Sequence, residues 1–195
     1  MTVAGLSSRL WLDIPRITDS LAQMRILKPP TPWLKMTGDI TVFLGGTIEC
    51  GRSTDWQGEF VDIVYNRLYH IPQIFNQILF LNPRRSEWDA SWKTSMDFQP
   101  FREQVEWELN GLEQCDLMVM NFLPGSNSMI TLMELGLFHD KAIVCCPDGY
   151  CRKGNVDIVC ERYQVPQVQT LEALSDAIVT KILQTVYTRS VPPTL

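Results

Sequence analysis

Short apolar runs alternate with longer amphipathic segments from residue 40 to the end of the chain, and this alternation limits the folds that the chain can adopt. Each short run predicts a strand: Ile40–Leu44, Gln77–Leu81, Leu117–Phe122, Ala142–Cys146 and Val165–Val168. Each longer segment predicts a helix: Trp56–Leu68, Pro100–Gln114, Met129–His139 and Leu171–Tyr187. Strands that alternate with helices are typical of parallel sheets. We therefore predict an α/β fold, with a doubly wound (flavodoxin/Rossmann-like) parallel sheet of about five strands and helices on both faces.

The chain has 195 residues, of which 45% are hydrophobic, enough for one sizeable core and too few for two ordinary domains. Proline and glycine interrupt the first 38 residues, so we predict an N-terminal extension or arm over residues 1–38. Residues 39–188 are expected to form the domain itself and residues 189–195 a C-terminal tail. Trp11 and Trp33 in the arm are expected to pack against the core or a neighbouring subunit.

Charge and hydropathy exclude several classes of partner. The formal net charge is −5, and no basic stripe is present to neutralise a phosphate backbone, so a nucleic-acid polymer is not expected. No apolar run reaches the roughly 18 residues of a membrane span, and the first residues lack the pattern of a signal peptide. We expect no membrane partner and a cytoplasmic location.

Six cysteines stand at positions 50, 115, 145, 146, 151 and 160. They form no Cys-x-x-Cys pair, and the two histidines, His70 and His139, lie far from them in sequence. A domain of this size does not need disulfides. We expect buried, reduced thiols and no metal.

Polar and turn-forming residues follow the predicted strands. The segments are Gly45–Arg52, Asn82–Arg85, Pro124–Ser128 and Pro147–Tyr150, and Ser126, Asn127 and Ser128 are all suitable N-caps for the next helix. In an open parallel sheet, ligands bind outside the carboxyl ends of the strands. These segments are therefore expected to line one crevice.

Two glutamates do not fit an ordinary core. Glu134 is the only charged residue of the apolar segment Met129–Phe138, and burying an unpaired carboxylate is costly unless it serves a purpose. Glu108 lies on or beside the predicted inward stripe of Phe101, Val105, Leu109 and Leu112. The alternatives are a solvated Glu134 on a helix edge and an edge position for Glu108 near Trp107.

Two carboxylates in one cavity are the minimum equipment for cleaving a glycosidic bond by double displacement, with carboxyl groups about 5 to 9 Å apart. The sequence contains no Ser-His-Asp arrangement, no phosphate loop and no Gly-x-Gly-x-x-Gly motif.

Three short motifs, within roughly Ile40 to Val165, resemble the nucleoside 2-deoxyribosyltransferase family and the related deoxynucleoside 5′-monophosphate N-hydrolases. Met133-Glu134-Leu135-Gly136 is similar to the nucleophile motif, so the resemblance implies that Glu134 attacks the sugar. Glu108-Leu109-Asn110-Gly111-Leu112, followed by Cys115-Asp116, resembles the segment with the acid that helps the base leave, although the family often has Asp there. Asp116 is expected to cap or orient a turn.

The third motif, Gly46–Arg52, is similar to the loop that cups the sugar and its 5′ end. Glu49 stands where the hydrolase relatives carry a basic residue, which favours an uncharged nucleoside, although Arg52, Arg84 and Arg85 remain possible phosphate ligands. The expected substrate-binding residues are Gly45, Gly46, Thr47, Ile48, Arg52, Arg84, Trp88, Ser126, Ser128 and Asp157. Trp88 or Trp92 is expected to stack on the base, and Asn155 or Asp157, in a loop, to serve a neighbouring subunit's pocket.

The resemblance implies cleavage of the N-glycosidic bond of a nucleoside through a sugar ester on Glu134, with transfer of the sugar to a second, free nucleobase. Ser128 aligns with an acidic residue in the transferases and a serine in the hydrolases, so hydrolysis of a nucleoside, a nucleotide or an NAD-like substrate is the alternative. A non-catalytic nucleoside-binding protein is another. No cofactor is expected, and the chain is expected to form a homo-oligomer.

Overall fold

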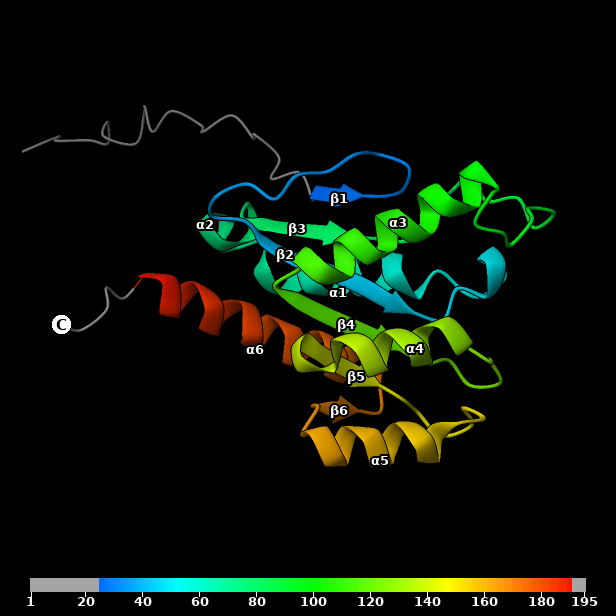
Figure 1. The fold of residues 1–195 in the computed structure, drawn as a ribbon. Helices are drawn as coiled ribbons and strands as arrows, with labels where there is room; N and C mark the ends of the chain where they lie inside the picture. Colours follow the sequence, from blue (N-terminus) through cyan, green and yellow to red (C-terminus); the bar gives the residue numbers. More distant parts are fainter. Residues whose placement is uncertain (1–24, 191–195) are drawn as a thin grey trace, which may run out of the picture.

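The computed structural model describes residues 25–190 and contains one parallel sheet. Six strands lie in the order β1-β3-β2-β4-β5-β6, and every neighbouring pair is parallel (Figure 1). The strands are β1 (Arg25–Leu27), β2 (Ile40–Gly46), β3 (Ile78–Leu81), β4 (Leu117–Asn121), β5 (Ala142–Cys145) and β6 (Gln167–Val168). The predicted α/β class, parallel sheet and doubly wound arrangement are confirmed.

The order of the strands defines where a ligand crevice opens. Leaving β1 aside, the strands from β2 onward follow the flavodoxin-like order, in which the first strand lies between the second and the third. The chain moves from β2 outward to β3 and then returns to place β4 on the other side of β2. The neighbours β2 and β4 therefore form the topological switch point, and their carboxyl ends should border the crevice.

Between residues 25 and 190, six helices cover the two faces of the sheet. They are α1 (Trp56–Leu68), α2 (Pro72–Phe75), α3 (Gln99–Gln114), α4 (Met129–Phe138), α5 (Lys153–Tyr163) and α6 (Leu171–Ser190), with 3-10 turns η1 (Glu49–Gly51) and η2 (His139–Lys141). Residues of α1 and α6 belong to the cluster on one face, and residues of α3, α4 and α5 belong to the cluster on the other. Figure 1 shows α3 and α4 side by side in front of the sheet, with their first turns at its carboxyl edge.

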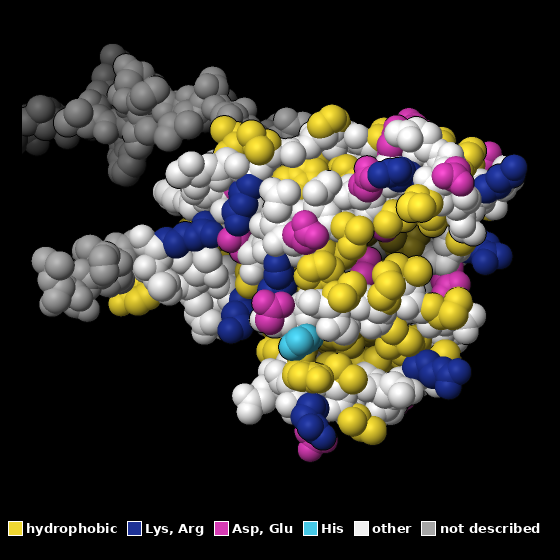
Figure 2. Space-filling view, viewed as in Figure 1, with side chains coloured by type: hydrophobic (Ala, Val, Ile, Leu, Met, Phe, Trp, Pro, Cys, Tyr) yellow, Lys and Arg dark blue, Asp and Glu magenta, His cyan; other side chains and the backbone are white. Residues whose placement is uncertain are grey.

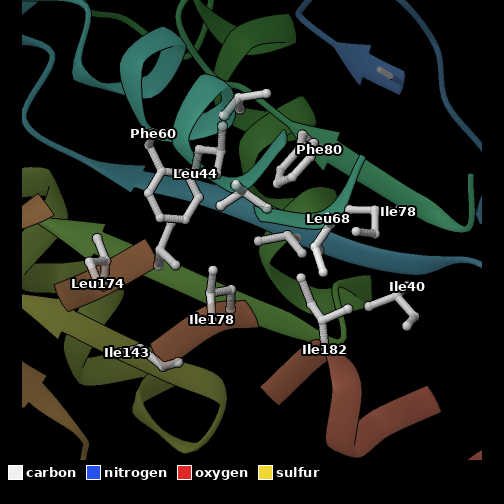
Figure 3. Packing of buried hydrophobic residues seen from close by; sticks show 14 of the residues in the cluster. Ile40, Leu44, Phe60, Leu68, Ile78, Phe80, Ile143, Leu174, Ile178 and Ile182 are labelled. Atoms are coloured by element: carbon white, nitrogen blue, oxygen red, sulfur yellow. The ribbon is translucent and has the colours of Figure 1, made fainter. Parts of the chain in front are cut away.

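The core follows from the two-residue period of the strands. Val42 and Leu44 of β2 pack with α1 and α6, whereas Phe43 between them packs with Trp107 of α3. Figure 3 shows the first of these clusters, in which Phe60 from α1 and Ile178 from α6 converge on the sheet. Because both faces are covered, the strands are apolar on both sides, as their continuous apolar runs indicate.

The boundaries of the domain differ from those predicted. β1 lies inside the segment assigned to an arm, yet it pairs with β3, and Arg25 is bonded to Asp39 at 2.6 Å. At the other end, α6 continues to residue 190, and Arg189 donates to the carbonyl oxygen of Asp39 at 2.9 Å. The sheet therefore begins before residue 39 and the last helix ends after residue 188. Trp33 is half-buried against the core, and Trp11 lies outside the described residues.

Helix α5 was not predicted from the sequence. α5 buries only Val156 and Cys160, which is too few apolar positions for a clear helical period. Asn155 and Asp157 consequently lie on this helix and not in a loop, which corrects the prediction.

Four of the cysteines are buried, as expected, but Cys50 and Cys151 are exposed because they lie in turns at the carboxyl edge of the sheet. Within residues 25–190, no group of three or more His, Cys, Asp or Glu side chains is arranged to hold a metal ion. None of the helices in the described part of the chain combines the length and the apolar character needed to cross a membrane.

Candidate active site

The loops after β2 and β4 meet at the switch point through three hydroxyl groups. Thr47 Oγ1 lies 2.6 Å from Ser128 Oγ and 3.1 Å from Ser126 Oγ, and the two serine oxygens are 2.9 Å apart. The Leu123 N–H also donates to Thr47 Oγ1 at 2.9 Å. All three hydroxyl residues are buried. Three predicted substrate-binding residues are thus together, in a cluster that joins the two loops.

Gly46 is required where β2 turns into its loop. Its φ is +141°, and a Cβ atom there would lie 2.5 Å from the Asn121 carbonyl oxygen and 2.8 Å from the Trp56 ring. The backbone of β2 therefore approaches β4 more closely than any side chain allows. Gly45, by contrast, is a buried strand residue whose added Cβ would meet no atom closer than 3.4 Å.

Arg84, after β3, supports the β2 loop from the side. Its guanidinium donates to the Ser53 hydroxyl at 2.8 Å, to the Thr54 carbonyl at 2.7 Å and to Gln57 Oε1 at 3.2 Å. These bonds use most of its donors within the protein, so in this structure Arg84 positions the loop. Its predicted contact with substrate stays a prediction.

Glu134 lies in the middle of α4, on the side that packs against the protein. It is only 7% exposed, and among residues 25–190 its carboxyl group has neither a hydrogen-bond donor nor a cationic partner. Burial raises the pKa of Glu134 to about 8, and the charge of Glu108 adds to the effect. An unpaired buried carboxyl group contributes little to a fold and is typical of functional sites.

Glu108, in α3, is the residue whose negative charge helps to raise the pKa of Glu134. Its Oε1 accepts a hydrogen bond of 2.8 Å from Gln104 Nε2, one turn earlier, and Gln104 also donates to the Pro83 carbonyl at 2.9 Å. Burial raises the pKa of Glu108 to about 7, while the bond from Gln104 acts in the opposite direction. The separation of about 5 to 9 Å between the two carboxyl groups stays a prediction.

The two carboxyl groups therefore titrate near neutrality instead of near pH 4.5. Because burial raises both pKa values toward neutrality, the pair can hold one proton between them. One proton donor beside one carboxylate is the requirement for acid-assisted displacement at a glycosidic carbon.

A hollow in the surface lies between α3 and α4, with hydrophobic side chains around it (Figure 2). Next to it, the loops after β2 and β4 enclose a depression of about 330 Å³ lined by Thr47, Glu49, Arg52, Ser53, Thr54, Leu123, Pro124, Gly125, Ser126 and Asn127. A second depression, of about 350 Å³, is lined by Lys35–Asp39 and Arg189 beside the amino end of β2. The depression between the loops after β2 and β4 is the candidate ligand site, because it lies at the switch point.

The other predicted binding residues lie in different surroundings. Trp88 is half-buried and packs against Trp92 in a tilted arrangement, with ring centroids 5.1 Å apart and an interplanar angle of 52°, and Arg85 lies over the Trp92 ring at 4.9 Å. Asp157, on α5, accepts hydrogen bonds from Lys153 of the same helix and from Gln167 of β6. Ile48 is half-buried and Arg52 exposed, both in the β2 loop.

Two local predictions were wrong. On α3 the buried positions are Gln104, Trp107, Gly111 and Leu112, so the inward face is rotated from the predicted stripe, whose Phe101, Val105 and Leu109 are half-buried. Ser128 is the first residue before α4, but its side chain does not cap the helix because its hydroxyl joins the cluster with Thr47. Asp116 lies just before β4, and its Oδ2 accepts from the Thr41 N–H of β2 at 2.8 Å, so the side chain joins the starts of these two strands.

Two roles were not predicted from the sequence. Gln104 donates a hydrogen bond to Glu108, and Glu49 accepts hydrogen bonds from backbone amides. Glu49 Oε1 accepts from the N–H groups of Asn127 and Ser128 at 3.0 and 3.2 Å. Gln104 stands four residues before Glu108, and this helical i,i+4 relation could have revealed the role of Gln104. No local pattern could have revealed the role of Glu49, because 78 residues separate Glu49 from Asn127.

The fold and the site thus define an α/β protein with a flavodoxin-like sheet, in which the carboxyl groups of Glu134 and Glu108 have raised pKa values and the charge of Glu108 acts on Glu134. The family model described as "Nucleoside 2-deoxyribosyltransferase like" matches residues 39–150, which is more than half of the chain. The chain belongs to this family, whose members are nucleoside-processing enzymes.

A search of curated proteins found no match. Among solved structures, the chain is similar to a conserved protein from Enterococcus faecalis V583, at 11% identity and a TM-score of 0.49. The similarity covers 75% of this chain and 99% of that one.

Proposed function

We propose that this protein cleaves the N-glycosidic bond of a nucleoside through a covalent sugar ester on Glu134 and transfers the sugar to a second nucleobase. The observation that carries the proposal is Glu134 itself, a buried carboxyl group without a donor or cation among the described residues, close enough to Glu108 for their charges to interact. Membership of the family supports the same chemistry.

In the first step, a carboxylate oxygen of Glu134 bonds to the anomeric carbon through an oxocarbenium-like transition state. The bond from that carbon to the base nitrogen breaks, and its electron pair leaves with the base. Glu108 delivers a proton to the departing base. In the second step, Glu108 takes a proton from the incoming base, whose nitrogen displaces Glu134 and restores the carboxylate.

The shared proton must lie on Glu108 when the bond breaks. In the free protein, burial favours protonation of Glu134 slightly more, since its pKa is about 8 against about 7 for Glu108. Positive charge develops on the sugar next to Glu134 during the reaction, and a nearby positive charge favours the ionised form of a carboxyl group. As this charge develops, the proton is therefore expected to lie on Glu108.

The depression between the loops is the proposed site for the 5′ end of the sugar. Its lining includes Thr47 and Ser126, and Ser128 lies beside them. Ser128 precedes Glu134 by six residues, or about 9 Å along the helix axis, a span that suits a sugar with its 5′ group. Trp88 and Trp92 are the proposed stacking partners for the base.

Product analysis tests the proposal and separates it from its alternatives. The protein is incubated with a 2′-deoxynucleoside and a second free base, and the products are resolved by chromatography. A new nucleoside is the expected product. Free sugar in place of a new nucleoside would identify a hydrolase, and binding without any product would identify a non-catalytic binder.

Variants at the two carboxyl groups test the assigned roles. Glu134→Gln should bind nucleoside yet lose turnover and give no sugar adduct by mass spectrometry, because an amide cannot form the ester. Glu108→Ala should slow cleavage of poor leaving bases by about 10²- to 10⁴-fold and spare activated ones. Glu113→Gln, which changes an exposed glutamate on the same helix as Glu108, is the control and should behave like the parent. Undiminished turnover by Glu134→Gln would refute the mechanism.

We also propose that the chain is a homo-oligomer. Met129, Ile130, Met133 and Leu137 form an outward apolar face of α4, and each is more than half exposed. The segment was predicted to be buried, but the described part of one chain covers only one side of it. Large apolar faces on single chains are typical of protein interfaces, and a second copy of this chain is the occupant that the family resemblance implies.

A further inference from the structure

Gln104 donates to Glu108 from one helical turn away, and its amide can do so in only one orientation. The Nε2 atom donates to Glu108 Oε1 at 2.8 Å and to the Pro83 carbonyl oxygen at 2.9 Å. A carbonyl oxygen only accepts hydrogen bonds, so turning the amide over would place Gln104 Oε1 against the Pro83 oxygen. The two N–H bonds of the Gln104 amide are therefore both used, one for each acceptor.

The loop after β3 holds Pro83 in place. The Arg84 N–H donates to Asn82 Oδ1 at 3.0 Å, which closes the turn around Pro83. The Arg84 guanidinium in turn donates to the Ser53 hydroxyl of the β2 loop at 2.8 Å. Gln104 itself is only 4% exposed. Its amide is therefore held both by the packing around α3 and by a turn that is bonded to the rest of the site.

Packing alone does not account for an amide at this position. Gln104 Oε1 is buried and has no hydrogen-bond partner among the described residues. A buried acceptor without a partner lowers stability, and an apolar side chain of the same length would fill the space without that cost. The amide differs from such a side chain in its N–H donors, which serve Pro83 and Glu108.

An exposed pair on the same helix shows how a glutamine four residues before a glutamate behaves without such support. Gln99 Nε2 donates to Glu103 Oε1 at 3.2 Å, and both side chains are exposed to water. Within residues 25–190 the Gln99 amide has no second partner that would fix its orientation. The burial of Gln104 and its bond to Pro83 therefore distinguish the pair that contains Glu108.

The bond from Gln104 decides which oxygen of Glu108 holds a transferable proton. Oε1 faces an N–H group and serves as an acceptor, so a proton on Glu108 lies on Oε2. When that proton leaves, the electron pair of the O–H bond stays on Oε2, and the bond from Gln104 becomes charge-assisted and stronger. Among the described residues no other group donates to Glu108, and Glu134 of α4 is its titratable neighbour.

We propose that Gln104 is a positioning residue for proton transfer, which keeps the proton of Glu108 on Oε2 and stabilises the carboxylate that remains after transfer. This inference rests on the proposed function, because it takes Glu108 as the acid that protonates the departing base. Gln104 acts on the reaction only through Glu108.

Infrared titration of Glu108 tests the contact without turnover. The carbonyl stretch of its protonated carboxyl group is isolated by subtracting the spectrum of Glu108→Gln, and its intensity is followed against pH. Gln104→Met removes the N–H donors at similar side-chain length, and Gln104→Ala is a second variant that adds no bulk. Gln99→Met removes the donor of the exposed pair and is the matched control. Thermal melting checks that each full-length variant is folded.

In the parent, the carbonyl band should lie at a lower wavenumber than in either Gln104 variant, because a hydrogen bond to Oε1 weakens the C=O bond. Loss of this bond should also raise the pKa of Glu108 by about one unit, since a hydrogen bond to the carboxylate favours the ionised form. Gln99→Met should change neither. A band or a pKa that stays unchanged in both Gln104 variants would overturn the inference.

Turnover separates a positioning residue from a structural one. Gln104→Met should slow the release of poor leaving bases by about tenfold or more, leave KM unchanged and spare activated bases. The double variant Gln104→Met, Glu108→Ala should be no slower than Glu108→Ala alone, because both changes act on the same proton. Losses that add in the double variant would show that Gln104 acts independently of Glu108 and would contradict the inference.

Failure of the proposed function has a different signature. If the infrared results are as expected but the parent gives no product, the catalytic proposal fails and the assignment of the Glu108 proton to Oε2 stands. If nucleosides are cleaved and neither the spectrum nor the turnover responds to Gln104, only this inference fails.

Discussion

Glu134 is the residue at which stability and function are expected to conflict. A buried carboxyl group with a raised pKa binds its proton more tightly in the folded protein than in the unfolded chain. Its favourable contribution is therefore fully present below the ordinary pKa of 4.5 and is lost as the pH rises through about 8. Glu108 acts in the same direction, with a folded-state pKa of about 7.

Glu134→Gln should consequently stabilise the protein at alkaline pH. The amide is neutral at every pH, so the free energy of unfolding should exceed that of the parent at pH 8.5 by up to about 5 kcal/mol, from a rise of about 3.5 pKa units at about 1.4 kcal/mol each. At pH 4.5 the two proteins should differ little. Urea unfolding at both pH values measures the effect, and Glu113→Gln serves as the exposed control. A difference independent of pH would mean that Glu134 is not a desolvated carboxyl group.

Gln104 connects the Glu108 carboxyl group to the loop after β3. Its Nε2 bonds to both Glu108 and the Pro83 carbonyl, while its Oε1 is buried without a partner among the described residues. The side chain thus holds the Glu108 carboxyl group against the loop after β3. A fixed orientation of this kind is what a proton donor needs, because proton transfer depends on hydrogen-bond geometry.

At the scale of elements, the site depends on how closely β2 approaches β4. The β2 loop leaves the strand at Gly46, and the Trp56 indole then donates to the Thr47 carbonyl at 2.9 Å, which links the loop to the start of α1. The hydroxyl cluster and the bonds of Glu49 both form beyond this point. A change in the spacing of the two strands should therefore disturb the whole depression.

Gly46→Ala tests this dependence. The added Cβ would lie within 2.8 Å of Asn121 and Trp56, and its φ of +141° is unfavourable for alanine, so we expect a loss of about 2 to 4 kcal/mol in unfolding free energy. Ligand binding should fall with it. Gly154→Ala, with no atom within 4 Å of the added Cβ, is the matched control and should leave the melting temperature near that of the parent. A fully stable Gly46→Ala protein would show that the strands can separate at no cost.

In the whole molecule, the exposed apolar face of α4 lies beside Glu134, because Ile130 precedes Glu134 by four residues and Leu137 follows it by three. Figure 2 shows hydrophobic side chains gathered around α3, α4 and α5 on this side of the protein. A second copy that covers α4 would also remove water from the neighbourhood of the site, and exclusion of water strengthens electrostatic interactions there. Assembly and activity are therefore expected to depend on each other.

Ile130→Lys combined with Met133→Lys should convert the assembly to a monomer. Two charges on the exposed face would have to be buried in the interface, which is costly, whereas both positions tolerate charge in a single chain because they are exposed. Sedimentation velocity at micromolar concentration measures the change. Leu34→Lys, at an exposed apolar position far from α4 in sequence, should leave the assembly intact. A parent protein that sediments as a fully active monomer contradicts the proposal.

The fold class was predictable from local features of the chain, and so was the choice of Glu134 and Glu108 as candidate residues. Apolar runs such as Ile40–Leu44 and Ala142–Cys146 predicted buried parallel strands, because hydrophobic period and segment length are local properties of the chain. Glu134 was recognisable because a single charge in an otherwise apolar helix is a conflict that can be read without coordinates. The family motifs added the nature of the chemistry.

The contacts between distant segments could not be predicted in this way. β1 has three residues and depends on β3 for its pairing, so no local period could mark it, and α5 buries too few apolar side chains to be recognised. The exposed side of α4 and the bonds from Glu49 to Asn127 and Ser128 depend on which segments pack together. Such contacts are set by the arrangement of the whole chain, because a side chain's partners in space are not its neighbours in sequence.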